Sequence, residues 1–198
     1  MNFRGRLPEP VILGRNLKPY TVGHDLILHA LESGFAIGTE NAPTFDDLIV
    51  STYLCSFHFD EAKGRVLDGE LMRKELEEWG REVGEFDACE PTSQLIAYIK
   101  AYTDAPEFWI EDKPTTKRCG APLSQILKVS MMRDFHMTEH AALHMPFNEA
   151  QTNYLTHLEM NGRLRFADDD DHAAVAAAMN PEVEKKLQAL AQRLAARN

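Results

Sequence analysis

Apolar residues recur every three or four positions through most of the chain, which is the period of a helix with one buried face. Cap residues, prolines and glycines divide this pattern into segments. Only residues 163–166 alternate polar and apolar as a short extended piece would. The sequence therefore predicts an all-α protein of about seven to nine helices. They are expected at residues 21–33, 44–57, 60–84 with interruptions near Gly64 and Gly69, 92–104 behind a Thr92 cap, 122–135, 138–144, 146–161 and 181–198.

Two segments carry especially clear helix signals. Thr44 is followed three residues later by Asp47, which is a variant of the capping box. The residues of this helix expected to face the core are Phe45, Leu48, Ile49 and Thr52. In the second part of the 60–84 region, charged residues fill one face and an apolar stripe fills the other. That stripe consists of Met72, Leu76, Trp79 and Val83.

We expect one compact helical domain at residues 21–198, preceded by an extended N-terminal arm at residues 1–20. The arm carries the apolar run Val11, Ile12 and Leu13 between prolines and glycines. Packing along the domain's own surface is the favoured interpretation, and contact with a partner is the alternative. The last helix, at 180–198, could be separable. Its apolar face could dock on the core or pair with a second copy, and it holds Val183, Leu187, Leu190 and Leu194.

Residues 105–121 form the longest irregular stretch, because Pro106, Pro114 and Gly120 preclude a continuous helix. This stretch also holds three large apolar residues, namely Phe108, Trp109 and Ile110. Such a loop either tucks these side chains into its own core or presents them to a partner. We favour packing within the chain and keep the partner interpretation as the alternative.

Composition excludes several classes of protein. The chain has 198 residues, of which 44% are hydrophobic and 26% charged, and its formal net charge is −10. An acidic chain repels phosphate backbones, so no nucleic-acid role is expected. No apolar run of membrane-spanning length and no export signal is visible, which predicts no membrane association and a cytosolic location. The three cysteines are expected to be reduced structural thiols.

One stretch carries a catalytic motif. His136, Glu139 and His140 match the H-x-x-E-H zinc-peptidase signature, in which two imidazoles one turn apart hold the metal. Thr138 argues against this interpretation, because a helix that it caps excludes His136 from the shared face. A zinc site would also need a third ligand, for which His144 and Glu149 are the candidates. We therefore expect no catalytic metal and no cofactor.

No glycine-rich phosphate loop, no G-x-S-x-G and no nucleophile with an obvious base stands in the sequence. We thus expect a protein that is not an enzyme. The alternative is that the protein is an enzyme, namely a zinc-dependent hydrolase that uses residues 136–140.

Several segments resemble small helical proteins of tailed bacteriophages and prophages. They are Val11 through His24, the Phe-Asp-Asp-Leu segment at 45–48, Met137 through Pro146, Glu149-Ala150 and Glu159-Met160-Asn161-Gly162. The class that the chain resembles most is the tail assembly chaperones. This resemblance implies a non-enzymatic assembly factor that binds tape-measure and tail tube proteins. It also implies a location in the cytoplasm of the bacterial host or in the virion. A structural virion protein of the neck or tail, acting as a homo-oligomeric adaptor, is the alternative.

Overall fold

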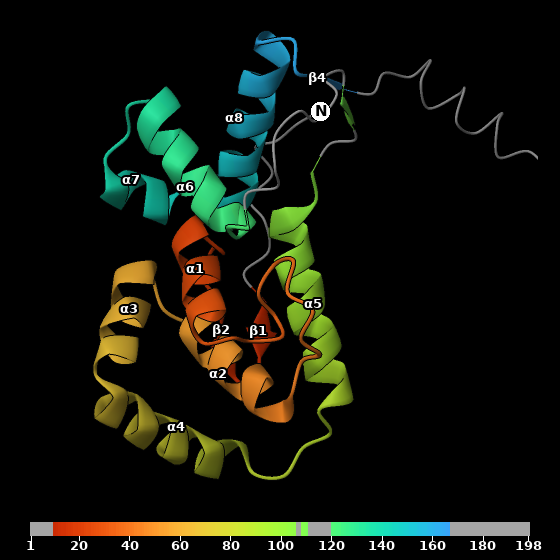
Figure 1. Ribbon diagram of the computed structural model, residues 1–198. Helices are drawn as coiled ribbons and strands as arrows, with labels where there is room; N and C mark the ends of the chain where they lie inside the picture. The colour runs from red at the N-terminus through yellow and green to blue at the C-terminus, as the bar shows by residue number, and fades with distance from the viewer. Residues whose placement is uncertain (1–9, 106–107, 111–119, 167–198) are drawn as a thin grey trace, which may run out of the picture. The chain divides into compact units, whose positions relative to one another are not determined.

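The computed structural model describes residues 10–105, 108–110 and 120–166 (Figure 1). Its contacts divide the chain into two compact units, one of Met1–Ala105 and Thr115–His157 and one of Pro106–Pro114 and Leu158–Asn198. The described part is mostly helical, which confirms the predicted fold class. Among the described residues, no helix combines the length and the apolar character needed to cross a lipid bilayer.

The described residues form eight helices and four short strands. The first unit contains β1 (Val11–Ile12), β2 (Arg15–Asn16), α1 (Val22–Ala30), α2 (Phe45–Cys55), α3 (Phe59–Leu67), α4 (Gly69–Val83), α5 (Cys89–Thr103), α6 (Leu123–Asp134), α7 (Glu139–His144) and most of α8 (Phe147–Met160). The second unit contains the end of α8 and an antiparallel pair of β3 (Phe108–Ile110) and β4 (Leu164–Phe166).

Helix α1 is central to the first unit, where it contacts α2, α3, α6 and α7. Its start is fixed by Thr21, whose side chain accepts a hydrogen bond from the His24 backbone N–H. The backbone around Thr21 also pairs with the break between α7 and α8, since Val22 N–H donates to the Met145 carbonyl at 3.1 Å and Phe147 N–H donates to the Tyr20 carbonyl at 3.0 Å. These bonds satisfy backbone groups that the helix break leaves free.

The N-terminal segment forms a tight hairpin. Val11 pairs with Asn16 and Ile12 pairs with Arg15, so Leu13 and Gly14 make a two-residue turn. Both turn residues have positive φ, +49° and +78°, as a type I′ turn requires. The hairpin lies against α5, and Ile12 is fully buried in the core. Residues 1–9 of the predicted arm lie outside the described part of the chain.

The core of the first unit gathers aromatic and aliphatic side chains from the hairpin and the helices. Its largest fully buried members include Tyr20, Tyr53, Phe147, Ile12, Leu17 and Leu28. The ring of Tyr20 meets Tyr98 edge-on at 6.0 Å and Phe147 at 6.1 Å. Burial of each such side chain stabilises the fold by about 1.5–3 kcal/mol.

Two polar residues of α1, His24 and Asp25, are also buried, which the helical period alone did not predict. The Nε2–H of His24 donates to the Phe57 carbonyl at 3.1 Å, because a carbonyl can only accept. Its Nδ1 then accepts from the Thr21 hydroxyl at 2.8 Å and from the Thr21 backbone N–H. Both ring nitrogens are therefore satisfied when the ring is neutral. A second proton, on Nδ1, would point at the Thr21 backbone N–H, which is also a donor.

The burial of His24 predicts a loss of stability on mild acidification. Desolvation by burial lowers the pKa of His24 from its ordinary value of 6.5 to about 4, with the hydrogen bond to the Phe57 carbonyl opposing the shift and the neighbouring His58 and His144 adding to it. Between these values the unfolded chain binds the proton and the folded chain does not, so stability falls as the pH drops from 6.5 towards 4. We expect His24 to account for a loss of about 3 kcal/mol across that window.

Urea denaturation at pH 7, 6, 5 and 4.5 measures this loss. The control is His24→Gln, which has no titrating ring and should show a clearly flatter profile between pH 6.5 and 4.5. Equal slopes for the two proteins would show that His24 does not govern the acid sensitivity.

Candidate functional site

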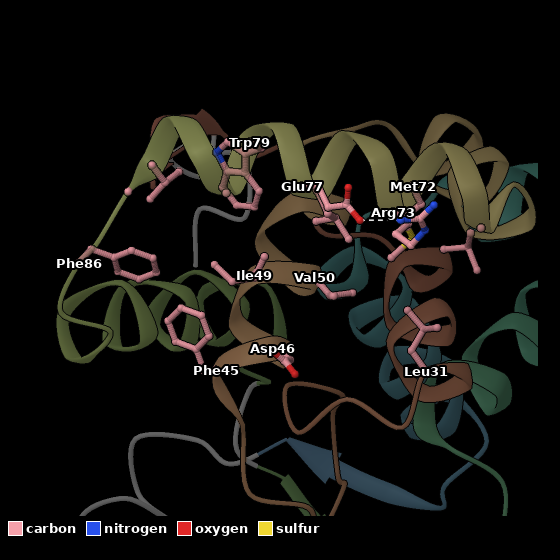
Figure 2. A pocket seen from close by; sticks show the side chains of 16 residues that line it. Leu31, Phe45, Asp46, Ile49, Val50, Met72, Arg73, Glu77, Trp79 and Phe86 are labelled. Carbon is pink, nitrogen blue, oxygen red and sulfur yellow. Dashed lines mark hydrogen bonds and ion pairs between the residues drawn. The ribbon is translucent and has the colours of Figure 1, made fainter.

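An open apolar groove lies between α2 and α4 in the first unit (Figure 2). It encloses about 760 Å³. Phe45 and Phe86 stand at one end and Leu31 at the other (Figure 2). Lining residues come from the whole length of α4 and from Gly84, which follows its last residue. At a rise of about 1.5 Å per residue, the groove is about 20 Å long, which is close to four turns of a helix.

The groove exists because the apolar stripe of α4 is only partly covered by the described residues. Trp79 is the one buried residue of this helix, whereas Met72, Leu76 and Val83 are half-buried. The prediction that these four residues share an apolar face is confirmed by their common place along the groove. An apolar stripe of this kind gains stability when something covers it.

The facing wall comes from α2 and corrects one expectation. Phe45 was expected to point into the core, but its side chain is 54% exposed and stacks on Phe86 with ring centroids 5.4 Å apart. Helix α2 buries Leu48 and the run from Ser51 to Cys55. The turn that carries Phe45 and Ile49 therefore faces α4 across the groove.

The charged residues along the groove carry a small excess of negative charge. The one cation among its lining residues, Arg73, is held by two carboxylates, Glu70 at 2.9 Å and Glu77 at 2.6 Å. Asp46 lines the opposite wall. Glu82 lies in an adjoining hollow, which it shares with Arg15. The groove thus combines an apolar floor with a slightly acidic rim.

The structure places the predicted partner-binding residues in different settings. Ile12 is fully buried, Leu13 packs against the core, and Val11 is 58% exposed. The backbone of Phe108 to Ile110 forms β3, whose side chains are outside the described part of the structure. The residues of the predicted C-terminal helix also lie outside it, namely Leu187, Leu190 and Leu194.

The H-x-x-E-H motif is not assembled on one helix. Helix α7 begins at Glu139, and the Thr138 hydroxyl caps it by accepting from the Ala141 N–H at 3.2 Å, as predicted. His136 precedes the cap with a φ of +54°, so it shares no helical face with His140. The Lys128 ammonium lies 2.6 Å from the Glu139 carboxylate, and this hydrogen bond lowers the pKa of Glu139. Glu139 is thus engaged in an ion pair on the surface.

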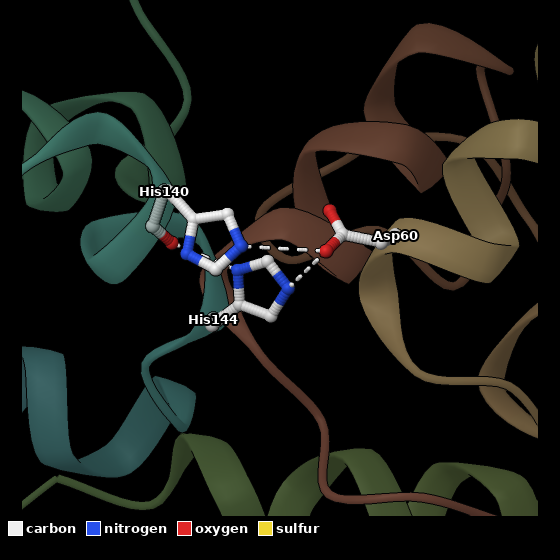
Figure 3. Close-up of side chains that lie close together, drawn as sticks. All are labelled: Asp60, His140 and His144. Atoms are coloured by element: carbon white, nitrogen blue, oxygen red, sulfur yellow. Dashed lines mark hydrogen bonds and ion pairs between the residues drawn. The ribbon is translucent and has the colours of Figure 1, made fainter.

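A different group of potential metal ligands does come together. Asp60, near the start of α3, meets His140 and His144 of α7 (Figure 3). The Asp60 Oδ2 lies 3.4 Å from His140 Nε2 and 3.0 Å from His144 Nε2. The sequence indicated His144 as a third ligand, but it gave no sign of Asp60.

Two of the three cysteines lie in the described part, and neither is an activated nucleophile. Burial raises the pKa of the Cys55 thiol to about 12. A hydrogen bond to the Asp87 carboxylate raises the pKa of the exposed Cys89. Because the thiolate is the reactive form, both thiols are poorly reactive near neutral pH. Cys119 is outside the described residues.

No protein-family model, curated protein or solved structure matches this chain. Two features of the described residues stand out for their chemistry, the groove between α2 and α4 and the cluster of Asp60, His140 and His144. The groove offers apolar area with an acidic rim, and the cluster offers two imidazoles and a carboxylate.

Proposed function

We propose that the protein is a non-enzymatic assembly factor of the tail-assembly chaperone kind that its sequence resembles. In this proposal, the groove between α2 and α4 binds an amphipathic helix of a tape-measure or tail tube protein. The observation that carries the proposal is the apolar stripe of α4, which the described segments cover only in part: Trp79 is buried, whereas Met72, Leu76 and Val83 stay half-buried along the groove.

The shape and charge of the groove favour a helix with basic flanks as the occupant. Helix-in-groove recognition places apolar residues at every third or fourth position of the guest into a trough between two helices. The groove runs along all of α4, which is long enough for about four turns of such a guest. Asp46 and the cluster of Glu70, Arg73 and Glu77, which carries one net negative charge, would attract lysine or arginine residues beside the guest's apolar stripe.

A substitution at the groove should abolish the complex. The full chain is co-expressed with the products of the genes beside its own, and the complex is recovered by affinity purification. We expect Ile49→Glu, which places a charge on the groove wall, to reduce recovery at least tenfold. The matched control is Ile96→Glu, since Ile96 is 48% exposed on α5 and does not line the groove.

Two further variants guard against a folding defect. Phe45 is 54% exposed, so Phe45→Ser removes an aromatic wall of the groove with little cost to the fold, and Leu67→Ser is its control at an exposed site outside the groove. Equal recovery of all variants, or no complex with any neighbouring gene product, would contradict the proposal. If the chain alone forms an oligomer and Ile49→Glu dissociates it, the result would favour the homo-oligomeric adaptor instead.

A further inference from the structure

The cluster of Asp60, His140 and His144 has an arrangement of donors and acceptors that calls for a cation. The Nδ1 of His144 lies 2.8 Å from the His140 carbonyl oxygen. A carbonyl can only accept, so this nitrogen carries a proton. In a neutral ring the other nitrogen, Nε2, then presents a lone pair.

That lone pair points at another acceptor. The His144 Nε2 lies 3.0 Å from the Asp60 Oδ2, and an ionised carboxylate has no proton to give. Two acceptors at this separation repel unless a positive charge lies between them. The charge can be a second proton on His144 or a bound metal ion.

The second histidine supplies a further ligand for a metal ion. The His140 ring stacks on the His144 ring with centroids 4.0 Å apart and planes 23° apart, and its Nε2 lies 3.4 Å from the same Asp60 oxygen (Figure 3). A proton on His144 alone would supply the charge for one ring, with the Nε2–H of a neutral His140 donating to Asp60. A divalent ion engages both rings at once, because it takes a lone pair from each neutral ring and a negative charge from Asp60.

The spacing of the three ligand atoms fits a metal ion. Ligands about 2.0–2.1 Å from zinc in a tetrahedral arrangement lie about 3.3 Å from one another. The separations from Asp60 Oδ2 to the two Nε2 atoms are 3.0 and 3.4 Å, and one ligand atom of each residue falls within 4.8 Å of the others. Because the two rings are stacked, their Nε2 lone pairs run nearly parallel, so binding requires one imidazole to turn. The side chain of His140 is 72% exposed and has room to make this rotation.

The surroundings hold one ligand in place and leave room for solvent. The bond from His144 Nδ1–H to a backbone carbonyl is the kind that orients metal-binding histidines and fixes their tautomer. Phe59 meets the same ring edge-on at 5.2 Å. The side chains of His140 and Asp60 are 72% and 60% exposed, so water can complete the coordination.

We propose that Asp60, His140 and His144 bind a divalent late first-row transition metal ion, for which Zn²⁺ is the probe. Two imidazoles and one carboxylate suit zinc, copper, nickel or cobalt, whereas magnesium and calcium prefer oxygen ligands alone. The ion joins α3 to α7, two helices far apart in the sequence. Because the unfolded chain does not hold these ligands together, binding stabilises the folded state.

Titration of the full, untagged and chelator-treated chain tests this site. We expect isothermal titration with Zn²⁺ to give one ion per chain, and Zn²⁺ to raise Tm by several degrees. Co²⁺ should give the visible absorption of a nitrogen- and oxygen-bound ion, while Mg²⁺ and Ca²⁺ should have no effect. Asp60→Asn, His140→Ala and His144→Ala should each weaken Zn²⁺ binding at least tenfold, with circular dichroism confirming that each variant folds.

The matched control separates this cluster from the H-x-x-E-H motif. His136→Asn removes the first histidine of the motif, and asparagine tolerates the positive φ at this position. We expect it to bind Zn²⁺ as the wild type does. Loss of binding in His136→Asn, unchanged binding in Asp60→Asn, or no binding of Zn²⁺ below millimolar concentration would overturn the proposal.

Discussion

Trp79→Ala should destabilise the protein by about 3–5 kcal/mol, because this side chain anchors α4 to the rest of the first unit. Trp79 is 5% exposed and is the buried residue of α4. Its ring lies 4.5 Å from the Arg15 guanidinium carbon and packs against Tyr53, and its indole N–H donates to the Leu13 carbonyl at 3.3 Å. Truncation removes the aromatic packing, a cation–π contact and a hydrogen bond together.

Urea denaturation followed by circular dichroism measures this loss. The matched control is Leu71→Ala, since Leu71 lies on the same helix and is 41% exposed. A change of no more than about 1 kcal/mol is expected there. A loss of similar size in both variants would mean that Trp79 is not the anchor. The groove shares this residue, so Trp79→Ala should also weaken partner binding under conditions in which the variant remains folded.

Asp25→Ala should be comparably costly, at about 3–5 kcal/mol, because it leaves buried donors without a partner. The Asp25 carboxylate is fully buried. One of its oxygens accepts from the Tyr20 hydroxyl at 2.8 Å and from the Ile37 N–H at 2.9 Å. Burial and the Asp25 charge raise the pKa of Tyr20 well above its ordinary value, so the hydroxyl stays protonated and donates.

Asp25→Asn provides the control for this prediction. The amide oxygen of asparagine can accept the same two hydrogen bonds, so the loss should be markedly smaller than for alanine. Thermal and urea denaturation of the two variants at pH 7 compare them directly. If asparagine is as damaging as alanine, the negative charge matters more than the two hydrogen bonds.

Local chemistry in the sequence was enough to predict most helix starts. Thr21, Thr44 and Thr138 each cap a helix through the hydroxyl, and the break before α8 falls where Pro146 was expected to place it. The prediction for Thr92 was wrong, because α5 begins three residues earlier at Cys89. Pro91 falls in the first turn of that helix, where a backbone N–H has no partner to lose.

Whether an apolar face is covered depends on distant parts of the chain. The sequence identified the stripe along α4 correctly, but it could not indicate that only Trp79 would be buried. It also assigned Phe45 to the core, since the helical period specifies a face and not the neighbour of that face. The groove therefore depends on the tertiary placement of α2 beside α4, which the sequence pattern does not specify.

The metal-ligand cluster was half visible in the sequence. His140 and His144 are one helical turn apart, a spacing that places both rings on one side of α7. The H-x-x-E-H pattern pairs His140 with His136 instead. Asp60 could not be found from spacing, because it belongs to α3 and reaches the histidines only through tertiary packing.

Hydrogen exchange on the complex of the full chain with a co-expressed tail protein tests the central claim most directly. Occupation of the groove predicts that backbone amides of α2 and α4, residues 45–55 and 69–83, become protected on binding, while those of α6 and α7 stay unchanged. Protection that spares α4, or that falls only on α6 and α7, would contradict the account.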